Sequence, residues 1–233
     1  MTQLTLDLPH RATFDRSDFL VSDCNITAVE WIDRWPAWPG VALVVHGPSG
    51  CGKTHLSRVW QERASAIVLA GEELTAAALP HFLGRSPPRI VIDDAERAGE
   101  RALLHLYNSC LEQQGNLLIT MRSPPGSWKI ELDDLRSRLR SAIVVGIQGP
   151  DDSLLGAVLF KHFADRQLRV SPDVIAYVTR RIERSFTAAE GLAARLDSAA
   201  LSGGRPVTIP LARRILMELG HQLPSPGSEA AVT

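Results

Sequence analysis

The chain has 233 residues, of which 45% are hydrophobic and 22% are charged, so it can bury a substantial core in one large domain or two small ones. A formal net charge of −1 excludes a strongly basic protein that binds DNA mainly through non-specific electrostatics, although it leaves room for a local basic patch. The three cysteines show no Cys-x-x-Cys spacing, which argues against a disulfide framework or a structural zinc site.

The sequence shows neither a signal peptide nor a membrane-spanning run. The amino terminus lacks a basic stretch followed by an apolar one, and no apolar run reaches the length that a bilayer needs. We therefore expect a cytoplasmic protein with no membrane partner.

Residues 1–12 alternate apolar and polar side chains, with Leu4, Leu6 and Leu8 as the apolar members. One interpretation is a frayed tail or a short edge strand. The other is an extended peptide that places its leucines in the pocket of a partner, because an isolated apolar peptide has nothing of its own to bury against. The spacing alone leaves both open.

Three tryptophans occur in the segment 13–40, which predicts a helix near 27–35 that ends before Pro36. Trp31, Trp35 and Trp38 are expected to be packing residues, because tryptophan at helical spacing is more often part of a core. A surface for base stacking is the alternative.

A Gly-rich loop follows the strand-like run 41–46 and opens the helix-like run 55–63. It reads GPSGCGKT, the G-x-x-x-x-G-K-[ST] pattern in its required position between a strand and a helix. The glycines let the backbone wrap a polyphosphate, the helix adds its positive dipole end, Lys53 reaches the β- and γ-phosphates, and Thr54 binds Mg²⁺. We predict nucleotide binding by Gly47, Pro48, Ser49, Gly50, Cys51, Gly52, Lys53, Thr54 and the next residue, His55.

Two carboxylates follow a later strand. After a short strand at 66–69 and a helix expected at 72–79, the apolar run 89–92 ends in Asp93 and Asp94. In an open parallel sheet this end of a strand borders the ligand crevice. Asp93 would hold Mg²⁺ through water, and Asp94 would position or polarise the attacking water as a general base. Such pairs are common in turns, but the spacing of two crossovers from the phosphate loop favours the functional interpretation.

Polar groups also mark the next two elements. A helix expected at 96–114 leads to a strand at 116–120 whose last residue, Thr120, either reaches the γ-phosphate or its water, or caps the strand end. A basic helical turn at 134–140 precedes the last strand, 142–145. Its arginines fit either a solvated face or a guanidinium presented to a phosphate on a neighbouring subunit.

Helical patterns take over from Pro150. The first carries His162 on its apolar face, where a histidine at the edge of a core is expected rather than a ligand. Three more helices are expected, opening at Ser171-Pro172, near 186 and at Thr208.

The predicted organisation is an α/β nucleotide-binding domain at 13–150 followed by a small helical domain at 151–220. The tail 221–233, rich in Pro, Ser and Gly, is predicted to be disordered.

Several motifs together resemble a known family. GPSGCGKTHL, VIDD, LLITMRSPP, DLRSRL and VTIPLARRIL, in that order, resemble the AAA+ domain of the bacterial initiator DnaA, over about residues 14–220. The resemblance implies a P-loop AAA+ parallel-sheet domain followed by a small all-helical lid domain. The segment around Phe14, Asp18, Phe19, Ser22 and Asn25 looks like the family's N-linker, which implies that Phe19 and Asn25 lie near the adenine.

Two departures from DnaA are informative. The helix-turn-helix domain that follows the lid in DnaA has no room here, and residues 3–8, QLTLDL, resemble a sliding-clamp-binding peptide of the Q-L-x-L-x-L type. Together they are similar to the Hda proteins, short relatives that act in the regulatory inactivation of DnaA. The implied partners are DnaA and the DNA polymerase III β sliding clamp, the latter bound through Gln3, Leu4, Leu6 and Leu8.

This resemblance also implies where the protein acts. A clamp-bound protein would lie with the replisome at the nucleoid, with indirect or weak DNA contact, and self-association is left open.

The resemblance further implies catalytic roles. Asp93 and Asp94 correspond to the Walker B pair, Thr120 to sensor 1 and Arg138 to the arginine finger that is inserted at a neighbouring DnaA subunit. Thr187 stands where the sensor 2 arginine is usual, so either Arg184 substitutes or the site binds a diphosphate without efficient hydrolysis. ATP or ADP with Mg²⁺ is the expected ligand, with ADP favoured and a weak ATPase of its own. A DnaA-recruiting adaptor and a self-contained ATPase acting on DNA are the alternatives.

Overall fold

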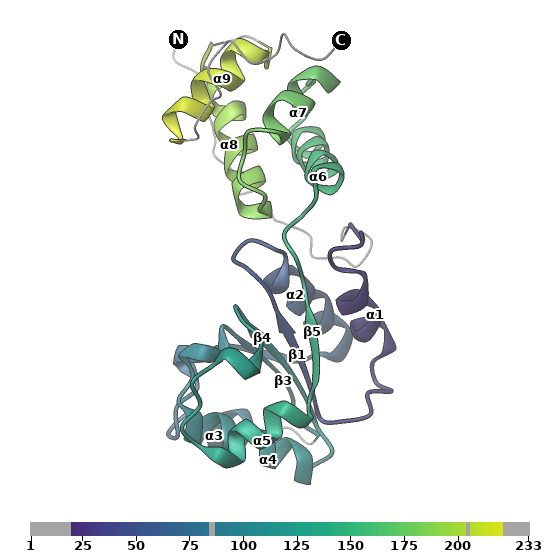
Figure 1. Cartoon of the computed structure of the whole chain (residues 1–233), viewed down its shortest axis with the longest axis vertical. Helices are drawn as coiled ribbons and strands as arrows, with labels where there is room; N and C mark the ends of the chain where they lie inside the picture. Colours follow the sequence, from purple (N-terminus) through teal and green to yellow (C-terminus); the bar gives the residue numbers. More distant parts are fainter. Residues whose placement is uncertain (1–19, 84–86, 204–205, 221–233) are drawn as a thin grey trace.

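The computed structural model describes residues 20–83, 87–203 and 206–220. Figure 1 shows an α/β unit and a helical unit, joined by the segment that leaves strand β5. The predicted clamp-binding residues Gln3, Leu4, Leu6 and Leu8, the N-linker residue Phe19 and the tail 221–233 lie outside the described residues.

A five-stranded parallel sheet forms the centre of the α/β unit, with strand order β2-β3-β4-β1-β5. All carboxyl ends therefore lie at one edge, and this arrangement confirms the predicted fold class. The strands are β1 (Ala42–His46), β2 (Ile67–Ala70), β3 (Arg89–Asp93), β4 (Asn116–Met121) and β5 (Ile143–Gly146).

Helices cover both faces of this sheet. Alternate residues of β1 show the two cores: Leu43 and Val45 pack in one cluster and Ala42 and Val44 in the other. Burial on both faces explains why the strands read as continuous apolar runs. Helices α1 (Ile26–Arg34) and α2 (Lys53–Ala64) cover the first face, and α4 (Glu100–Glu112) and α5 (Asp133–Ser141) cover the second.

The tryptophans pack as predicted. Trp60 is fully buried, Trp38 stacks on it at a centroid distance of 5.3 Å, and Trp35 meets it edge-on at 6.0 Å. Trp31 packs against the same cluster. The packing interpretation is therefore confirmed over base stacking.

The prediction of a helix at 72–79 is wrong. The chain instead forms a 3₁₀ turn, η2 (Gly71–Glu73), then turns, then the short helix α3 (Leu79–Phe82). Local side-chain bonds compete with a helix here, because Glu73 accepts from the N–H of Ala70 at 2.8 Å and Thr75 accepts from that of Ala78 at 3.3 Å.

The helix expected at 96–114 is divided in two. A 3₁₀ turn, η3 (Ala95–Arg97), precedes α4, and the extended backbone of Gly99 separates them. A further 3₁₀ turn, η4 (Pro125–Ser127), follows β4.

The helical unit has its own core. Its helices are α6 (Asp152–Asp165), α7 (Pro172–Thr179), α8 (Phe186–Gly203) and α9 (Ile209–Glu218), as predicted in number and order. Its fully buried side chains include Leu155, Leu159, Val178, Leu192, Leu196 and Leu216. His162 is half-buried, and burial lowers its pKa. None of the helices in the described ranges has the length and apolar character needed to cross a membrane.

Candidate functional site

The phosphate loop begins between two strand ends. The N–H of Gly47 donates to the carbonyl of Met121 at 3.1 Å, and that of Ile147 donates to the carbonyl of His46 at 2.7 Å. A Cβ on Gly47 would clash with the Ile147 carbonyl oxygen, and Gly52 opens α2 with a φ of 100°. Both positions therefore require glycine, one for space and one for its backbone conformation.

Lys53 lies inside this loop. Its side chain is only 7% exposed, and its ammonium donates to the carbonyls of Gly47 at 2.7 Å and Pro48 at 2.9 Å. Its third N–H donor has only a long contact with the Cys51 sulfur, at 4.0 Å, which a phosphate oxygen could replace. The loop thus fixes a positive charge beside the amino terminus of α2, an arrangement that suits a polyphosphate.

Other titratable groups of the loop add no charge near neutral pH. Burial, helped by the charge of Lys53, lowers the pKa of His46, so its imidazole is neutral. Burial also raises the pKa of the Cys51 thiol, although Lys53 opposes this shift. The loop's charge is therefore that of Lys53.

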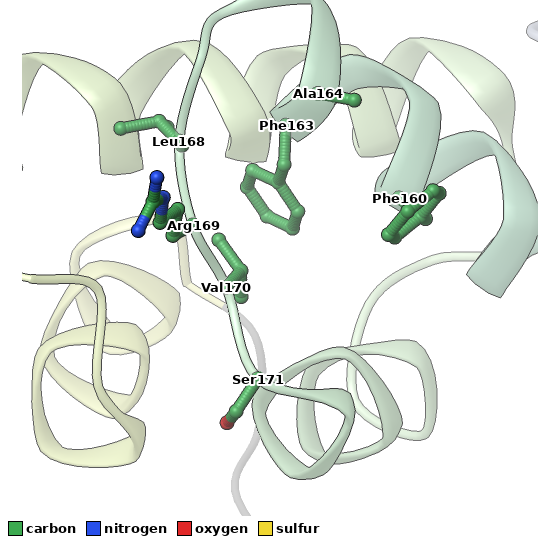
Figure 2. A pocket seen from close by; sticks show the side chains of 7 residues that line it. All are labelled: Phe160, Phe163, Ala164, Leu168, Arg169, Val170 and Ser171. Atoms are coloured by element: carbon green, nitrogen blue, oxygen red, sulfur yellow. The ribbon is translucent and has the colours of Figure 1, made fainter.

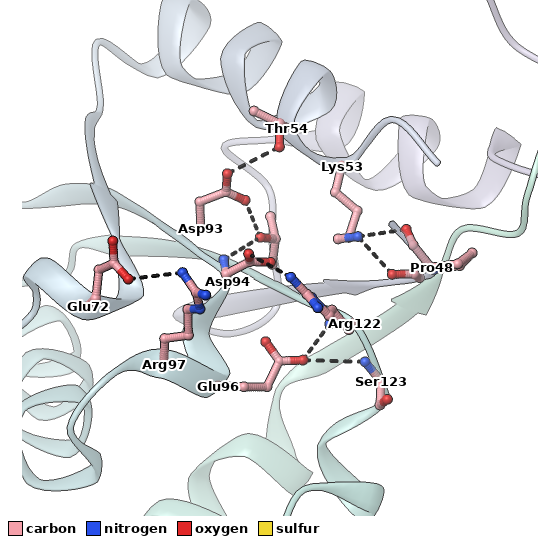
Figure 3. A network of polar contacts seen from close by, with 12 residues as sticks. Pro48, Lys53, Thr54, Glu72, Asp93, Asp94, Glu96, Arg97, Arg122 and Ser123 are labelled. Atoms are coloured by element: carbon pink, nitrogen blue, oxygen red, sulfur yellow. Dashed lines mark hydrogen bonds and ion pairs between the residues drawn. The ribbon is translucent and has the colours of Figure 1, made fainter. Parts of the chain in front are cut away.

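Thr54 and Asp93 meet at the same edge. The Thr54 hydroxyl donates to one carboxylate oxygen of Asp93 at 3.1 Å, as Figure 3 shows. A hydroxyl and a carboxylate oxygen are hard ligands, and Mg²⁺ usually takes one or two such groups along with water and phosphate oxygens. These residues therefore fit the magnesium role predicted for them.

The hydroxyl of Thr120 connects the two aspartates. It donates to the other carboxylate oxygen of Asp93 and accepts from the backbone N–H of Asp94 at 3.0 Å. Thr120 is fully buried at the carboxyl end of β4. The hydroxyl thus positions the acidic turn, while its contact with a γ-phosphate stays a prediction.

Sequence reasoning missed the partner of Asp94. The guanidinium of Arg122 lies 3.7 Å from the Asp94 carboxylate, and Figure 3 shows the two side chains facing each other. Arg122 comes just after β4, at the sheet edge where β3 also ends. The position of Arg122 in the sequence could have predicted its place at the site, because a residue that directly follows a parallel strand lies beside the ligand crevice.

The helical unit contacts the phosphate loop directly. The N–H of Phe186 donates to the carbonyl of Gly50 at 2.7 Å. A Cβ on Gly50 would lie 2.8 Å from that of Ser185 and 3.1 Å from the Thr187 hydroxyl. Thr187 therefore lies against the loop, whereas Arg184 forms an exposed ion pair with Asp152 at 2.9 Å.

The helices over the loop also match a known family. Residues 152–216 match the family model described as "Hda, lid domain". The helical unit of this chain is thus similar to the lid domain of Hda proteins.

Other similar proteins are bacterial replication initiators. The chromosomal replication initiator protein DnaA of Magnetococcus marinus is 25% identical over 97% of this chain. Domain III of Thermotoga maritima DnaA has a TM-score of 0.75 at 17% identity and covers 88% of this chain and 96% of its own. AMPPCP-bound DnaA from Aquifex aeolicus has a TM-score of 0.71 at 16% identity, covering 88% of this chain and 68% of its own. The chain spans only about half of the full-length initiators, 55% in the Magnetococcus case.

Asn25, the predicted N-linker residue, is buried and stabilises its own loop. Its carbonyl oxygen accepts from Ser22 N–H at 3.0 Å and its amide donates to the Leu20 carbonyl at 3.0 Å. The N–H of Gln148 donates to the Cys24 carbonyl at 3.0 Å. Asn25 thus shapes a segment tied to the connection between β5 and α6, and its contact with adenine stays a prediction.

Arg138, the predicted arginine finger, lies away from the chain's own phosphate loop. It is exposed on α5, which leads into the amino end of β5, whereas the loop follows the carboxyl end of the parallel strand β1. Figure 1 shows α5 at the end of the α/β unit opposite the lid. Its guanidinium lies 6.0 Å from the centre of the Tyr107 ring, and no carboxylate of the described residues pairs with it.

The lid also carries a hollow of its own. This cavity has a volume of about 460 Å³ and a largely apolar lining, and its Phe160 is 62% exposed. Figure 2 shows the side chains that line it. Its lining has one charged side chain, Arg169. The lining residues are Phe160, Phe163, Ala164, Leu168, Arg169, Val170 and Ser171.

Proposed function

We propose that this chain binds an adenine nucleotide with Mg²⁺ and promotes the hydrolysis of ATP bound to DnaA, which restrains the initiation of replication. The observation that carries the proposal is the position of Arg138, exposed at the edge of the sheet opposite to the chain's own phosphate loop. A guanidinium placed there is suited to a nucleotide on another subunit.

Nucleotide binding is supported by the loop. The buried ammonium of Lys53 and the hydroxyl of Thr54 beside Asp93 provide phosphate and magnesium ligands. The Aquifex DnaA neighbour has AMPPCP bound. We propose ADP as the resident ligand, because Thr187 cannot supply the positive charge that a sensor 2 arginine would direct at a third phosphate.

The trans effect is supported by the chemistry of arginine. Arginine stays charged and presents a planar fork, so it stabilises the charge that develops on the transferred phosphoryl group. Comparable fingers contribute roughly 10³–10⁵ in rate. The lack of an ion pair to Arg138 within the described part of the chain leaves its guanidinium available for a partner.

We propose that residues 3–8 tether the protein to the β sliding clamp through Gln3, Leu4, Leu6 and Leu8. The support is the QLTLDL sequence alone. A tether on DNA-loaded clamp would raise the local concentration of Arg138 near initiator at the replication site.

The decisive experiment mixes ATP-bound DnaA, clamp-loaded DNA and this protein, and measures ADP formation. Wild-type protein should stimulate hydrolysis, and Arg138→Ala should remove most of the stimulation. Arg140→Ala is the matched control, because it removes the same charge from an exposed position two residues further along α5. Equal stimulation by the Arg138→Ala variant would sink the proposal and leave a recruiting adaptor in its place.

A second measurement separates tethering from catalysis. Clamp pull-down with the double variant Gln3→Ala/Leu8→Ala should lose clamp, while Arg138→Ala should retain it. Robust ATPase of the wild-type protein without DnaA would instead favour a self-contained ATPase.

A further inference from the structure

Two adjacent carboxylates of the Walker B turn face different partners. Asp93 accepts hydrogen bonds from Thr54 and Thr120, whereas Asp94 pairs with Arg122 at 3.7 Å. Figure 3 shows the Asp94 side chain turned toward the guanidinium. The predicted magnesium ligand Asp93 is thus held by two hydroxyls, while the candidate general base Asp94 is paired with a guanidinium.

An exposed ion pair contributes little free energy by itself, and the Arg122 and Asp94 side chains are 62% and 38% exposed. Here, however, the loop that carries the arginine is also held. The carboxylate of Glu96 accepts from the backbone N–H of Arg122 and, at 3.4 Å, from that of Ser123.

Glu96 belongs to η3, the turn that follows Asp94 directly. Asp94 itself adopts the left-handed conformation, with a φ of 53° and a ψ of 55°, and its N–H is bonded to Thr120. The turn that begins at Asp94 therefore carries the Asp94 carboxylate, and its Glu96 also binds the backbone of the loop that carries Arg122. Hydrogen bonds to backbone N–H groups therefore hold both segments that carry the ion pair, at the ends of β3 and β4.

We propose that Arg122 is a positioning residue that turns Asp94 away from the attacking water and so keeps this chain's own ATP hydrolysis slow. The inference rests on the proposed nucleotide binding, and it concerns the chain's own site rather than DnaA's. Arg122 would thus be a second restraint on the rate of the chain's own ATP hydrolysis. It is separate from Thr187, which lies on the lid side of the loop.

The step under restraint is hydrolysis of the terminal phosphate. The water oxygen forms a bond to the γ-phosphorus, the bond from that phosphorus to the bridging oxygen breaks, and ADP leaves. The proton of the water passes to the carboxylate and then to the phosphate product. A carboxylate can accept this proton only when it points at the water within hydrogen-bond reach. A carboxylate turned to Arg122 does not meet that requirement.

The test compares single-turnover ATP hydrolysis by the purified full chain with its affinity for a fluorescent ADP analogue. Arg122→Ala should raise the hydrolysis rate roughly fivefold, the effect expected from loss of an exposed ion pair at the upper end of its usual strength. The affinity for the analogue should stay within about twofold of wild type, because Arg122 acts through Asp94 and not on the diphosphate.

Three further variants make the result specific. Arg122→Lys keeps the charge and should return the rate toward wild type. Arg97→Ala removes another exposed ion pair of the same region, to Glu72 at 2.9 Å, and should leave the rate unchanged. The double variant Arg122→Ala/Asp94→Asn should lose the gain, because the gain passes through the carboxylate.

An unchanged or lower rate in Arg122→Ala that binds the analogue normally would overturn the inference, as would a gain that survives in the double variant. A wild-type chain that binds no nucleotide would overturn both this inference and the proposed nucleotide site. Loss of DnaA stimulation alone would leave the inference standing.

Discussion

The backbone N–H of Phe186 donates to the carbonyl of Gly50 at 2.7 Å, so the lid helix α8 begins on the phosphate loop itself. Lid and loop therefore share a backbone hydrogen bond as well as side-chain packing. A change in the shape of the loop must move the start of α8, and a displaced lid must remove a partner from the loop.

Gly50→Ala tests this contact. Gly50 has a φ of 69°, so an alanine there would have a strained left-handed backbone. Its Cβ would also lie 2.8 Å from the Cβ of Ser185, so the lid would have to shift. We expect a loss of about 1–3 kcal/mol in the free energy of unfolding, measured by denaturant titration.

The matched control is Gly191→Ala, within α8, where nothing lies near the added methyl group. Alanine there should stabilise the protein by about 0.5–1 kcal/mol. Equal effects of the two substitutions would contradict the role given to Gly50.

Thr120→Val removes the hydroxyl that links the two aspartates. The N–H of Asp94 and one oxygen of Asp93 lose their partner, and burial makes such a loss cost about 1–3 kcal/mol. Nucleotide affinity should also become less dependent on Mg²⁺, as followed by a titration with and without the metal.

For comparison, Thr179→Val removes a buried hydroxyl from the lid, where it donates to the carbonyl of Ile175 at 2.8 Å. This variant should leave the magnesium dependence as in wild type. A change of equal size in both variants would mean that Thr120 acts only on stability.

Lys53→Ala should weaken nucleotide binding. The ammonium is expected to provide a charge-assisted hydrogen bond to phosphate, so the dissociation constant for ADP should rise about 10–100-fold. The rise in melting temperature that ADP produces in wild type should shrink accordingly. Lys129→Ala, an exposed lysine after η4, should retain the full ADP-dependent shift.

Acid should destabilise the protein through two half-buried histidines. Burial lowers the pKa of His46 and of His162 from the usual 6.5, with Lys53 adding to the effect at His46 and Arg166 at His162. The unfolded chain therefore takes up protons first as the pH falls below 6.5. The stability present above that pH is lost as the pH falls through the folded pKa values.

Unfolding free energies measured at several pH values between about 7 and 5 check this expectation. His46→Gln and His162→Gln should each flatten the dependence, and the double variant should flatten it further, because the two sites share no partner. A slope unchanged in the double variant would assign the acid sensitivity to other groups.

Local patterns in the chain were enough to predict the sheet and the loop. Buried parallel strands read as short apolar runs, and a Gly-rich turn with Lys53 and Thr54 between a strand and a helix has few other uses. The same logic predicted Asp93 and Asp94 at the sheet edge, where the structure brings Thr54 to Asp93.

Contacts between distant segments could not be predicted in this way. Periodicity also does not report the two local hydrogen bonds, accepted by Glu73 and Thr75, that compete with a helix at 72–79. The pairing of Arg122 with Asp94 and the meeting of Phe186 with Gly50 depend on how strand ends and lid are placed in three dimensions.

The backbone hydrogen bond from Gln148 N–H to the Cys24 carbonyl joins the amino-terminal segment to the connection after β5. Gln148 lies in the connection from β5 to α6, the segment that joins the α/β unit to the helical unit. A force applied ahead of Leu20 would therefore reach this joining segment through the hydrogen bond as well as through the chain.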